Sequence, residues 1–199
     1  MNLEDYRTLF VATSLVLILI ATVPVIALVV PFPRSGESFS ELWLLGPTHM
    51  AEDYPFNVGV GEEYSVFVGV GNHMGCSEYY MVYVKFRNQT QPLPDVSSSK
   101  PSPLPPLYEF QFFVADGEAW ESLLMFEILD ASVQVDSVFV GSVLINGVAF
   151  SVDSFSMWDS ENNGFYYQLF FELWLYDMAS QSFQYHDRFV GIWLNVTGS

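Results

Sequence analysis

An uncharged segment near the N-terminus constrains the fold of this chain more than any other feature. Between Arg7 and Arg34 lie 26 residues without a charged side chain, and Leu9–Val30 is apolar almost throughout. As a helix, which rises about 1.5 Å per residue, this run is long enough to cross roughly 30 Å of hydrocarbon. We therefore predict a transmembrane helix over residues 8–30, ended by Pro31.

A cleaved secretory signal peptide is the alternative, with a small-residue cleavage site at residues 25–27. The apolar run is longer than a usual signal core and follows two acidic residues, so an uncleaved anchor is the preferred interpretation. Each flank of the apolar run carries one arginine, Arg7 or Arg34, so the flanking charges do not set the orientation of the helix. A long domain follows the helix, and long domains are translocated largely regardless of charge. We expect residues 1–7 in the cytoplasm, residues 8–30 in the lipid bilayer of the cell membrane as a single pass, and the remainder outside the cell.

The charge balance excludes one class of partner. The chain has 6 basic and 23 acidic residues, a net charge of −17, and residues 35–199 carry 21 of the acids and four of the bases. Nucleic acids and other polyanions need a basic surface, which this composition does not provide. The single cysteine, Cys76, excludes an intrachain disulfide framework, a four-cysteine zinc site and a CxxC redox centre. We expect no cofactor.

Apolar residues after the anchor recur with a period of two, which is typical of β-strands with one buried face. In one such run Val66, Val68 and Val70 would share a face. The runs with this pattern are residues 42–45, 64–70, 79–87, 108–114, 123–129, 133–140, 143–150, 165–176 and 189–196. These short strands, separated by turn residues, predict a mainly β, antiparallel β-sandwich over residues 41–199.

Alternation within the runs also predicts which side chains face solvent. Tyr79 and Tyr83 share the outer face of a half-exposed strand with Lys85 and Arg87, and Trp193 faces outward in the last run. Because aromatic residues dominate interface energetics, such rings are candidate contacts for a protein partner. The candidate interaction residues are Tyr79, Tyr83, Trp174, Tyr176 and Trp193. The alternative is that these rings pack under loops or on the second sheet.

Two connecting segments differ in composition from the strands. Residues 31–40 form a short linker, so the sandwich should sit close to the bilayer. Residues 91–106 contain six of the chain's eleven prolines and predict a stiff, extended surface loop between strands. A ligand for a proline-recognition domain is the alternative for this loop.

Three short motifs concern modification or ion binding. Asn88 and Asn195 each begin an Asn-x-Thr glycosylation sequon, which fits a domain outside the cell. Residues 159–164 (DSENNG) copy the first half of a calcium-binding loop, but Phe170 stands where the bidentate Glu is needed. A turn closing at residues 163–164 explains the same residues with fewer assumptions.

No motif assigns a catalytic or metal site. The sequence contains no GxSxG, HExxH or GxGxxG motif. His73 and Cys76 lie close together, but their order differs from that of blue-copper ligands. Glu118 and Glu121 could form a carboxylate pair, although on a strand they would face opposite sides. We therefore assign no catalytic and no metal-binding residue and expect a protein that is not an enzyme.

Several motifs occur in a fixed order along the domain. They are residues 44–47 (LLGP), 51–55 (AEDYP), 61–62 (GE) and 117–121 (GEAWE), followed by Arg188 and Trp193. This series resembles an uncharacterised family of archaeal predicted membrane proteins with a domain of unknown function. The resemblance implies an archaeal, membrane-anchored, immunoglobulin-like β-sandwich with no established activity.

The first two motifs together are expected to form a turn. Glu52 and Asp53 can accept backbone amides, and Pro55 fixes the exit of the chain. The residues of this motif turn are Leu45, Gly46, Pro47, Glu52, Asp53, Tyr54 and Pro55.

These observations favour a non-enzymatic, membrane-anchored cell-surface protein whose sandwich contacts other membrane or envelope proteins, or copies of itself. A subunit of an archaeal surface filament is the alternative, because pilins also join an apolar helix to a β-sandwich. A pilin should carry a basic leader cleaved before the apolar run, and residues 1–7 (MNLEDYR) contain no such signal. A metal-dependent surface enzyme is a third hypothesis, which the acidic composition permits.

Overall fold

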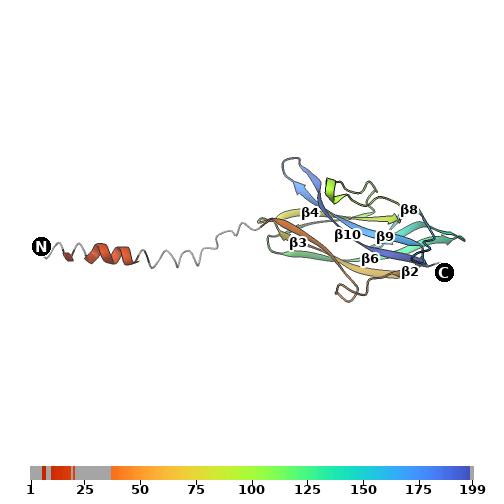
Figure 1. Ribbon diagram of the computed structural model, residues 1–199, viewed down its shortest axis with the longest axis horizontal. Helices are drawn as coiled ribbons and strands as arrows, with labels where there is room; N and C mark the ends of the chain where they lie inside the picture. Colours follow the sequence, from red (N-terminus) through yellow and green to blue (C-terminus); the bar gives the residue numbers. More distant parts are fainter. Residues whose placement is uncertain (1–5, 8–9, 19, 21–36, 198–199) are drawn as a thin grey trace. The chain divides into compact units, whose positions relative to one another are not determined.

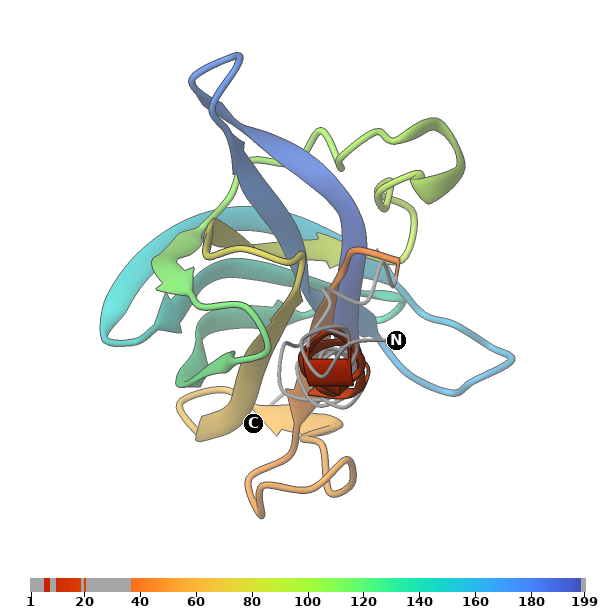
Figure 2. The same ribbon diagram turned by 90° about the vertical axis from the view of Figure 1, so that its left-hand side faces the viewer.

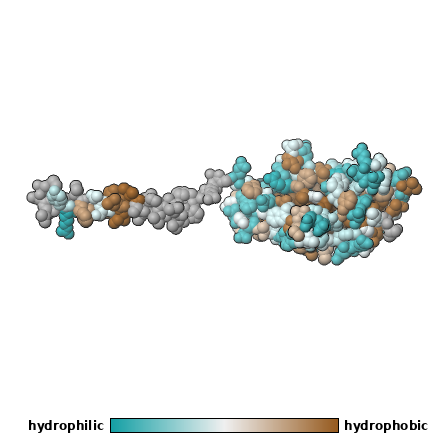
Figure 3. All heavy atoms as spheres, turned by 60° about the horizontal axis from the view of Figure 1, so that its bottom comes forward, coloured by the Kyte–Doolittle hydropathy of each residue, from teal (hydrophilic) through white to brown (hydrophobic). Residues whose placement is uncertain are grey.

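The computed structural model describes residues 6–7, 10–18, 20 and 37–197 (Figure 1). The chain divides into two compact units, Met1–Glu37 and Ser38–Ser199. Within the first unit, residues 10–18 are helical and their apolar side chains are exposed: Phe10 is 74% exposed and Ile18 is 63% exposed. Figure 3 shows strongly hydrophobic side chains gathered on this described segment.

The predicted membrane span extends past the described helix. Residues 8–9, 19 and 21–30 of the span, and residues 31–36 of the predicted linker, lie outside the described residues. Among the residues that are described, no helix is long and apolar enough to cross a membrane.

The second unit is built from strands. Its described residues form β1 (Phe39–Leu45), β2 (Asn57–Gly59), β3 (Glu63–His73), β4 (Glu78–Asn88), β5 (Tyr108–Val114), β6 (Ala119–Val133), β7 (Ser137–Ile145), β8 (Val148–Met157), β9 (Tyr166–Asp177) and β10 (Ser182–Thr197), with a short 3-10 helix, η1 (Val96–Ser98). Five strands form sheet A, in the order β1-β3-β6-β7-β8, and five form sheet B, in the order β2-β10-β9-β4-β5.

The two sheets pack face to face as a β-sandwich (Figures 1 and 2). The first part of the chain contributes to both sheets: β1 pairs antiparallel with β3, whereas β2 pairs parallel with β10. Connections that switch between the sheets, such as β3 to β4 and β5 to β6, are characteristic of this architecture. The predicted β-sandwich is therefore confirmed.

The core lies between the sheets and follows the predicted alternation. Val66, Val68 and Val70 of β3 are 0% exposed, and so are Tyr80 and Val82 of β4. The last strand behaves in the same way, with Ile192, Leu194 and Val196 buried and Trp193 outside. Burial of one face of each sheet thus produces the period of two.

Several strand predictions are wrong in their boundaries; residues 133–140, for example, run across the connection between β6 and β7 at residues 134–136. Residues 143–150 are not one strand, because Asn146 and Gly147 form a two-residue turn between β7 and β8. Their φ angles of 47° and 79° are those of a type I′ turn, which joins antiparallel strands with the correct twist. The first strand begins at Phe39 rather than residue 42, since it pairs with β3 over its whole length.

A buried polar network holds one end of the sandwich together. Asn72, which is 0% exposed, donates to the carbonyl oxygens of Cys76 and Val114, both at 2.8 Å. The Tyr80 hydroxyl lies 2.7 Å from Ser40 Oγ and 3.2 Å from Asn72 Oδ1. Asn72 therefore ties the loop after β3 to the end of β5.

His186 extends this network from β10, where its Nε2 lies 3.0 Å from Ser40 Oγ. Burial lowers the pKa of His186 below its ordinary value, and Arg188 lowers it further, while Asp187 and Glu78 act in the opposite direction. The folded protein thus favours the neutral imidazole.

The motif turn forms the connection between β1 and β2. Gly46 N donates to the Met50 carbonyl at 2.7 Å, and the Tyr54 hydroxyl donates to the Leu44 carbonyl at 2.8 Å. A Cβ atom on Gly46 would overlap the backbone oxygen of Glu52. Backbone contacts and the Tyr54 hydroxyl hold this turn, instead of the carboxylates expected from the sequence.

We predict that Gly46→Ala destabilises the protein by about 1–3 kcal/mol, because the new methyl group must displace backbone atoms. Gly59→Ala is the matched control, since its Cβ would meet only the tip of the Glu62 side chain, at 3.0 Å. Urea denaturation of the purified full-length chain measures both effects. Equal midpoints for the two variants would contradict this account.

We also predict that His186 makes stability depend on pH. Its folded-state pKa is depressed, so the unfolded chain binds the proton more readily and the folded state loses stability as pH falls below about 6.5. His186→Gln removes this titration. Denaturation at about pH 7.5 and about pH 5.5 should show the variant gaining stability relative to wild type at the lower pH. A pH-independent difference would exclude this role for His186.

Candidate interaction surface

Four of the five candidate contact residues lie together on the outer face of sheet B. Tyr79 and Tyr83 come from β4, and Trp174 and Tyr176 come from β9, which pairs with β4. They alternate with residues of the same strands that point into the core, such as Val82 and Leu173. The outer face therefore carries a row of half-buried rings.

At one end of this row is a group of rings that we call the aromatic cluster: Tyr79, Phe113, Tyr176 and Phe183. Tyr79 stacks on Phe113 with ring centroids 4.3 Å apart and an angle of 12° between the rings. Phe183 lies 5.0 Å from Tyr79 and 5.3 Å from Tyr176. Phe113 is 73% exposed, so the cluster presents a large apolar ring to solvent.

The middle of the row is tied to a buried carboxylate. Tyr83 packs edge-on against Trp174, with centroids 5.3 Å apart, and Trp174 lies 5.9 Å from Tyr185. Trp174 Nε1 donates to Glu172 Oε2 at 3.2 Å. Burial, together with the charge of Glu172, raises the pKa of Tyr185 to about 12.

Glu172 forms a buried ion pair with Lys85 on the outer face of sheet B. Lys85 Nζ lies 2.8 Å from Glu172 Oε2, and the two side chains are 3% and 0% exposed. Ser102, in the proline-rich loop, contacts both partners: its carbonyl accepts from Lys85 Nζ and its amide donates to Glu172 Oε1, each at 2.8 Å. The outer face of β4, which the sequence predicted to be half-exposed, is therefore covered by the proline-rich loop at Lys85.

The proline-rich loop, residues 91–106, folds back over sheet B (Figure 2). Asp95 begins η1 and accepts hydrogen bonds from Ser97 and Ser98, which lower the pKa of Asp95 to about 2. Ser99 Oγ donates to Asp187 Oδ2 of β10 at 3.0 Å. The predicted loop between strands is thus present, between β4 and β5, and it is attached to the sheet, which its composition did not indicate.

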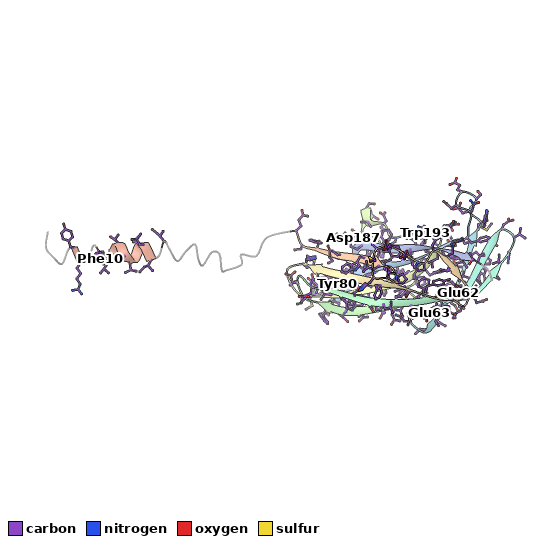
Figure 4. All side chains as sticks on the ribbon, turned by 90° about the horizontal axis from the view of Figure 1, so that it is seen from below. Phe10, Glu62, Glu63, Tyr80, Asp187 and Trp193 are labelled. Carbon is purple, nitrogen blue, oxygen red and sulfur yellow. The ribbon has the colours of Figure 1, made fainter. Side chains whose placement is uncertain are left out.

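Trp193, the fifth candidate, is labelled in Figure 4 and lies further along β10, where it pairs with Gln168, whereas Phe183 of the aromatic cluster pairs with Tyr176. The guanidinium of Arg87 lies 5.3 Å from the centre of the Trp193 ring. Arg87 is 5% exposed, and it donates to the carbonyls of Asn88 and Gln89 at 2.8 Å. Burial lowers the pKa of Arg87.

Both sequon asparagines hold defined positions. Asn88 Nδ2 donates to the Phe155 carbonyl at 2.7 Å, and Asn195 Nδ2 donates to Asn57 Oδ1 at 2.8 Å. An amide nitrogen has two hydrogens, so each keeps one that these bonds do not use. Glycosylation at Asn88 and Asn195 stays a prediction.

The residues considered for chemistry are engaged separately. His73 lies 3.6 Å from a Glu41 oxygen, whereas Cys76 Sγ donates to Glu78 Oε1 at 3.1 Å. This hydrogen bond is the largest cause of the raised pKa of Cys76, which favours the thiol over the nucleophilic thiolate. No group of three or more His, Cys, Asp or Glu side chains that could hold a metal occurs within the described part of the chain.

The carboxylates of the GEAWE motif also have different roles. Glu121 pairs with His49 and accepts from Trp43 Nε1 at 3.3 Å. Glu118 uses its backbone carbonyl to accept from Asn72 N at 3.0 Å. These contacts link the motif to the loop after β1 and to the buried network around Asn72.

Sequence reasoning missed several members of the surface. Phe113 and Phe183 complete the aromatic cluster, and Phe183 becomes visible once β9 and β10 are recognised as a hairpin that pairs it with Tyr176. Lys85 and Glu172 each interrupt an apolar run, which was the available signal for a buried pair. Nothing in the sequence places Ser102 beside them.

The chain was compared with known proteins. The profile of a family described as "Domain of unknown function (DUF1616)" matches residues 33–139. No curated protein matches the sequence significantly. Among solved structures, the CARDB domain of a Pyrococcus furiosus protein, crystallised with di-metal ions, is 8% identical, with a TM-score of 0.41 over 84% of this chain and 100% of that chain. A β-glucosidase from Listeria innocua is 13% identical, with a TM-score of 0.32 over 81% of this chain and 16% of that chain. Similarities at this level carry no argument about function.

We predict that Lys85→Met destabilises the protein by about 3–5 kcal/mol, because it leaves Glu172 as a buried charge without its partner. Adding Glu172→Gln to this variant should recover much of the loss, since the amide keeps an acceptor for Ser102 N. Denaturation midpoints test both effects, and limited proteolysis within residues 91–106 reports whether the loop detaches. A single variant as stable as wild type would refute this role of the pair.

Proposed function

Since the chain belongs to the DUF1616 family, whose function is unknown, we propose that it is a non-enzymatic, membrane-anchored cell-surface protein. Its sandwich, in this proposal, binds another membrane or envelope protein through the aromatic cluster of sheet B. The single observation that carries the proposal is the exposed stack of Phe113 on Tyr79.

The anchor is supported by the N-terminal segment. The sequence has 26 uncharged residues between Arg7 and Arg34, and the described residues Phe10, Ile18 and Ile20 are each more than 60% exposed. Apolar side chains on a helix need an apolar environment, which a bilayer provides. A single N-terminal anchor would place the sandwich close to the membrane surface.

The aromatic cluster has the composition of the centre of a protein interface. Aromatic rings bury large areas and are enriched among the residues that contribute most to binding. Acidic residues adjoin the cluster in the chain: Glu78 precedes Tyr79, and Asp177 follows Tyr176. We infer a partner with an apolar patch bordered by basic residues, because complementary charge aids association.

An enzymatic role has less support. Cys76 is held as a thiol by Glu78, and Glu121 is held by His49 and Trp43. Neither arrangement joins a nucleophile, a base and an orienting group, as covalent catalysis requires.

Extraction of the native protein from its own membranes in mild detergent tests the proposal. Size measurement and mass spectrometry of the extract should find a defined complex with a different protein. A long homopolymer would favour the filament subunit instead. A monomer that copurifies with nothing after chemical cross-linking would refute both functions.

We predict that Phe113→Glu disrupts this complex, because it places a charge at the centre of the apolar contact. Val135→Glu is the matched control: Val135 is 94% exposed and lies in the turn between β6 and β7 of sheet A. The amount of partner recovered with each variant is the measurement. Equal recovery with both variants would show that the aromatic cluster is not the contact.

A further inference from the structure

A second site lies on sheet B, apart from the aromatic cluster. It is a surface hollow of about 390 Å³, which we call the Trp193 hollow. Its walls come from the segment before β2, the residue after β4, the β8–β9 connection with the start of β9, and β10. The lining residues are Phe56, Gln89, Asp159, Asn162, Tyr166 and Trp193. We propose that the Trp193 hollow binds a neutral saccharide.

One side of the hollow is aromatic. Phe56 is 47% exposed and Trp193 is 41% exposed, and Phe56 lies 5.9 Å from Tyr166 between ring centroids. A pyranose ring has an apolar face of C–H groups, and the flat face of an aromatic side chain packs against it. The exposed rings therefore supply the apolar half of a sugar site.

The orientation of Trp193 is set before any ligand arrives. Arg87 lies against the ring at 5.3 Å and is itself fixed by the carbonyls of Asn88 and Gln89. Through these bonds the same guanidinium supports Gln89, which also lines the hollow. A preorganised wall lowers the entropy lost on binding.

The lining also offers planar polar groups, from Gln89, Asp159 and Asn162. Asp159 Oδ1 accepts from the amides of Glu161 and Asn162, and its Oδ2 accepts from Asn162 Nδ2 at 2.8 Å. Gln89 Nε2 reaches the same oxygen at 3.5 Å. These four bonds use about all the acceptor positions of the carboxylate and hold it in place. Each side-chain amide nitrogen of Gln89 and Asn162 keeps a second hydrogen, so these two amides can donate to sugar hydroxyls.

The charges favour a neutral ligand. The lining includes one carboxylate and no cationic side chain, so an anion would be repelled by Asp159. An aromatic cage for an organic cation would need a free face of Trp193 without a nearby positive charge. The guanidinium of Arg87 already lies over this ring, which disfavours a second cation.

The hollow continues along β10. A neighbouring cavity of about 440 Å³ shares Phe56 and Trp193 with it and is also lined by Tyr54 and Gly191. Phe56 and Trp193 thus lie between two adjoining spaces, which gives room for more than one sugar unit. We expect an oligosaccharide to bind more tightly than a monosaccharide.

The two sequons, far apart in the sequence, converge on this hollow. Asn88 immediately precedes Gln89, and Asn195 pairs in register with Tyr166 and hydrogen-bonds to Asn57, next to Phe56. A glycan on either asparagine would begin beside the lining. The bound saccharide can therefore be a glycan of this protein or a polysaccharide of its surroundings.

The test uses the full-length chain, prepared both from a host without N-glycosylation and from its native membranes. A panel of neutral mono- and oligosaccharides is screened by ligand-observed NMR, and tetramethylammonium is the probe for an organic cation. Unglycosylated wild type should bind at least one oligosaccharide. Absence of saccharide binding, or binding of tetramethylammonium alone, would overturn the proposal.

We predict that Trp193→Ala and Phe56→Ala each weaken binding at least about tenfold, because each removes a stacking surface. Trp158→Ala is the matched control: Trp158 is 46% exposed but packs edge-on against Phe165 and does not line the hollow. Trp193→Phe should retain part of the affinity. Denaturation midpoints verify that each variant folds, and equal weakening by the control would also overturn the site.

The native preparation distinguishes the two sources. If the protein's own glycan fills the hollow, added oligosaccharide should bind only after enzymatic removal of the glycan. If the ligand is external, binding should be the same before and after removal. Either result supports the site.

Discussion

The buried ion pair between Lys85 and Glu172 organises the outer face of sheet B. Removing two charges from water is costly, and the pair is tolerated because Ser102 supplies both an acceptor for Lys85 and a donor for Glu172. The pair, the proline-rich loop and the covered part of the sheet therefore depend on one another. The loop leaves two parts of this face uncovered. One is the aromatic cluster, toward one end of the sheet, and the other is the Trp193 hollow, which lies apart from the cluster.

The inward faces of the strands could be predicted because one buried face imposes a period of two, as for Val66, Val68 and Val70. The outer face could not be predicted in the same way. A lysine within a strand ordinarily indicates solvent, and Lys85 is buried only because a loop closed by Ser102 covers it. Proline content indicates a stiff loop but carries no information about where that loop docks.

The candidate sites show the same limit. Tyr79, Tyr83, Trp174 and Tyr176 could be placed on one face from alternation, but the exposure of the cluster depends on Phe113, which only the pairing of β4 with β5 brings beside Tyr79. The Trp193 hollow combines residues from four separate segments. Sequence reasoning correctly proposed a turn at residues 159–164 but could not foresee that Asp159, which closes this turn, also lines a hollow with Trp193.

The burial of Lys85 and Arg87 also shapes the electrostatics of the whole domain. Residues 35–199 contain four basic side chains, and these two are 3% and 5% exposed, which leaves only Lys100 and Arg188 at the surface of the described sandwich. The charged side chains at this surface are therefore almost all acidic. The field of these charges accelerates encounter with basic proteins and weakens as salt rises, whereas a neutral saccharide does not respond to it. The two proposed sites on sheet B thus differ in the physics of recognition: apolar contact assisted by charge at the aromatic cluster, and stacking with hydrogen bonds at the Trp193 hollow.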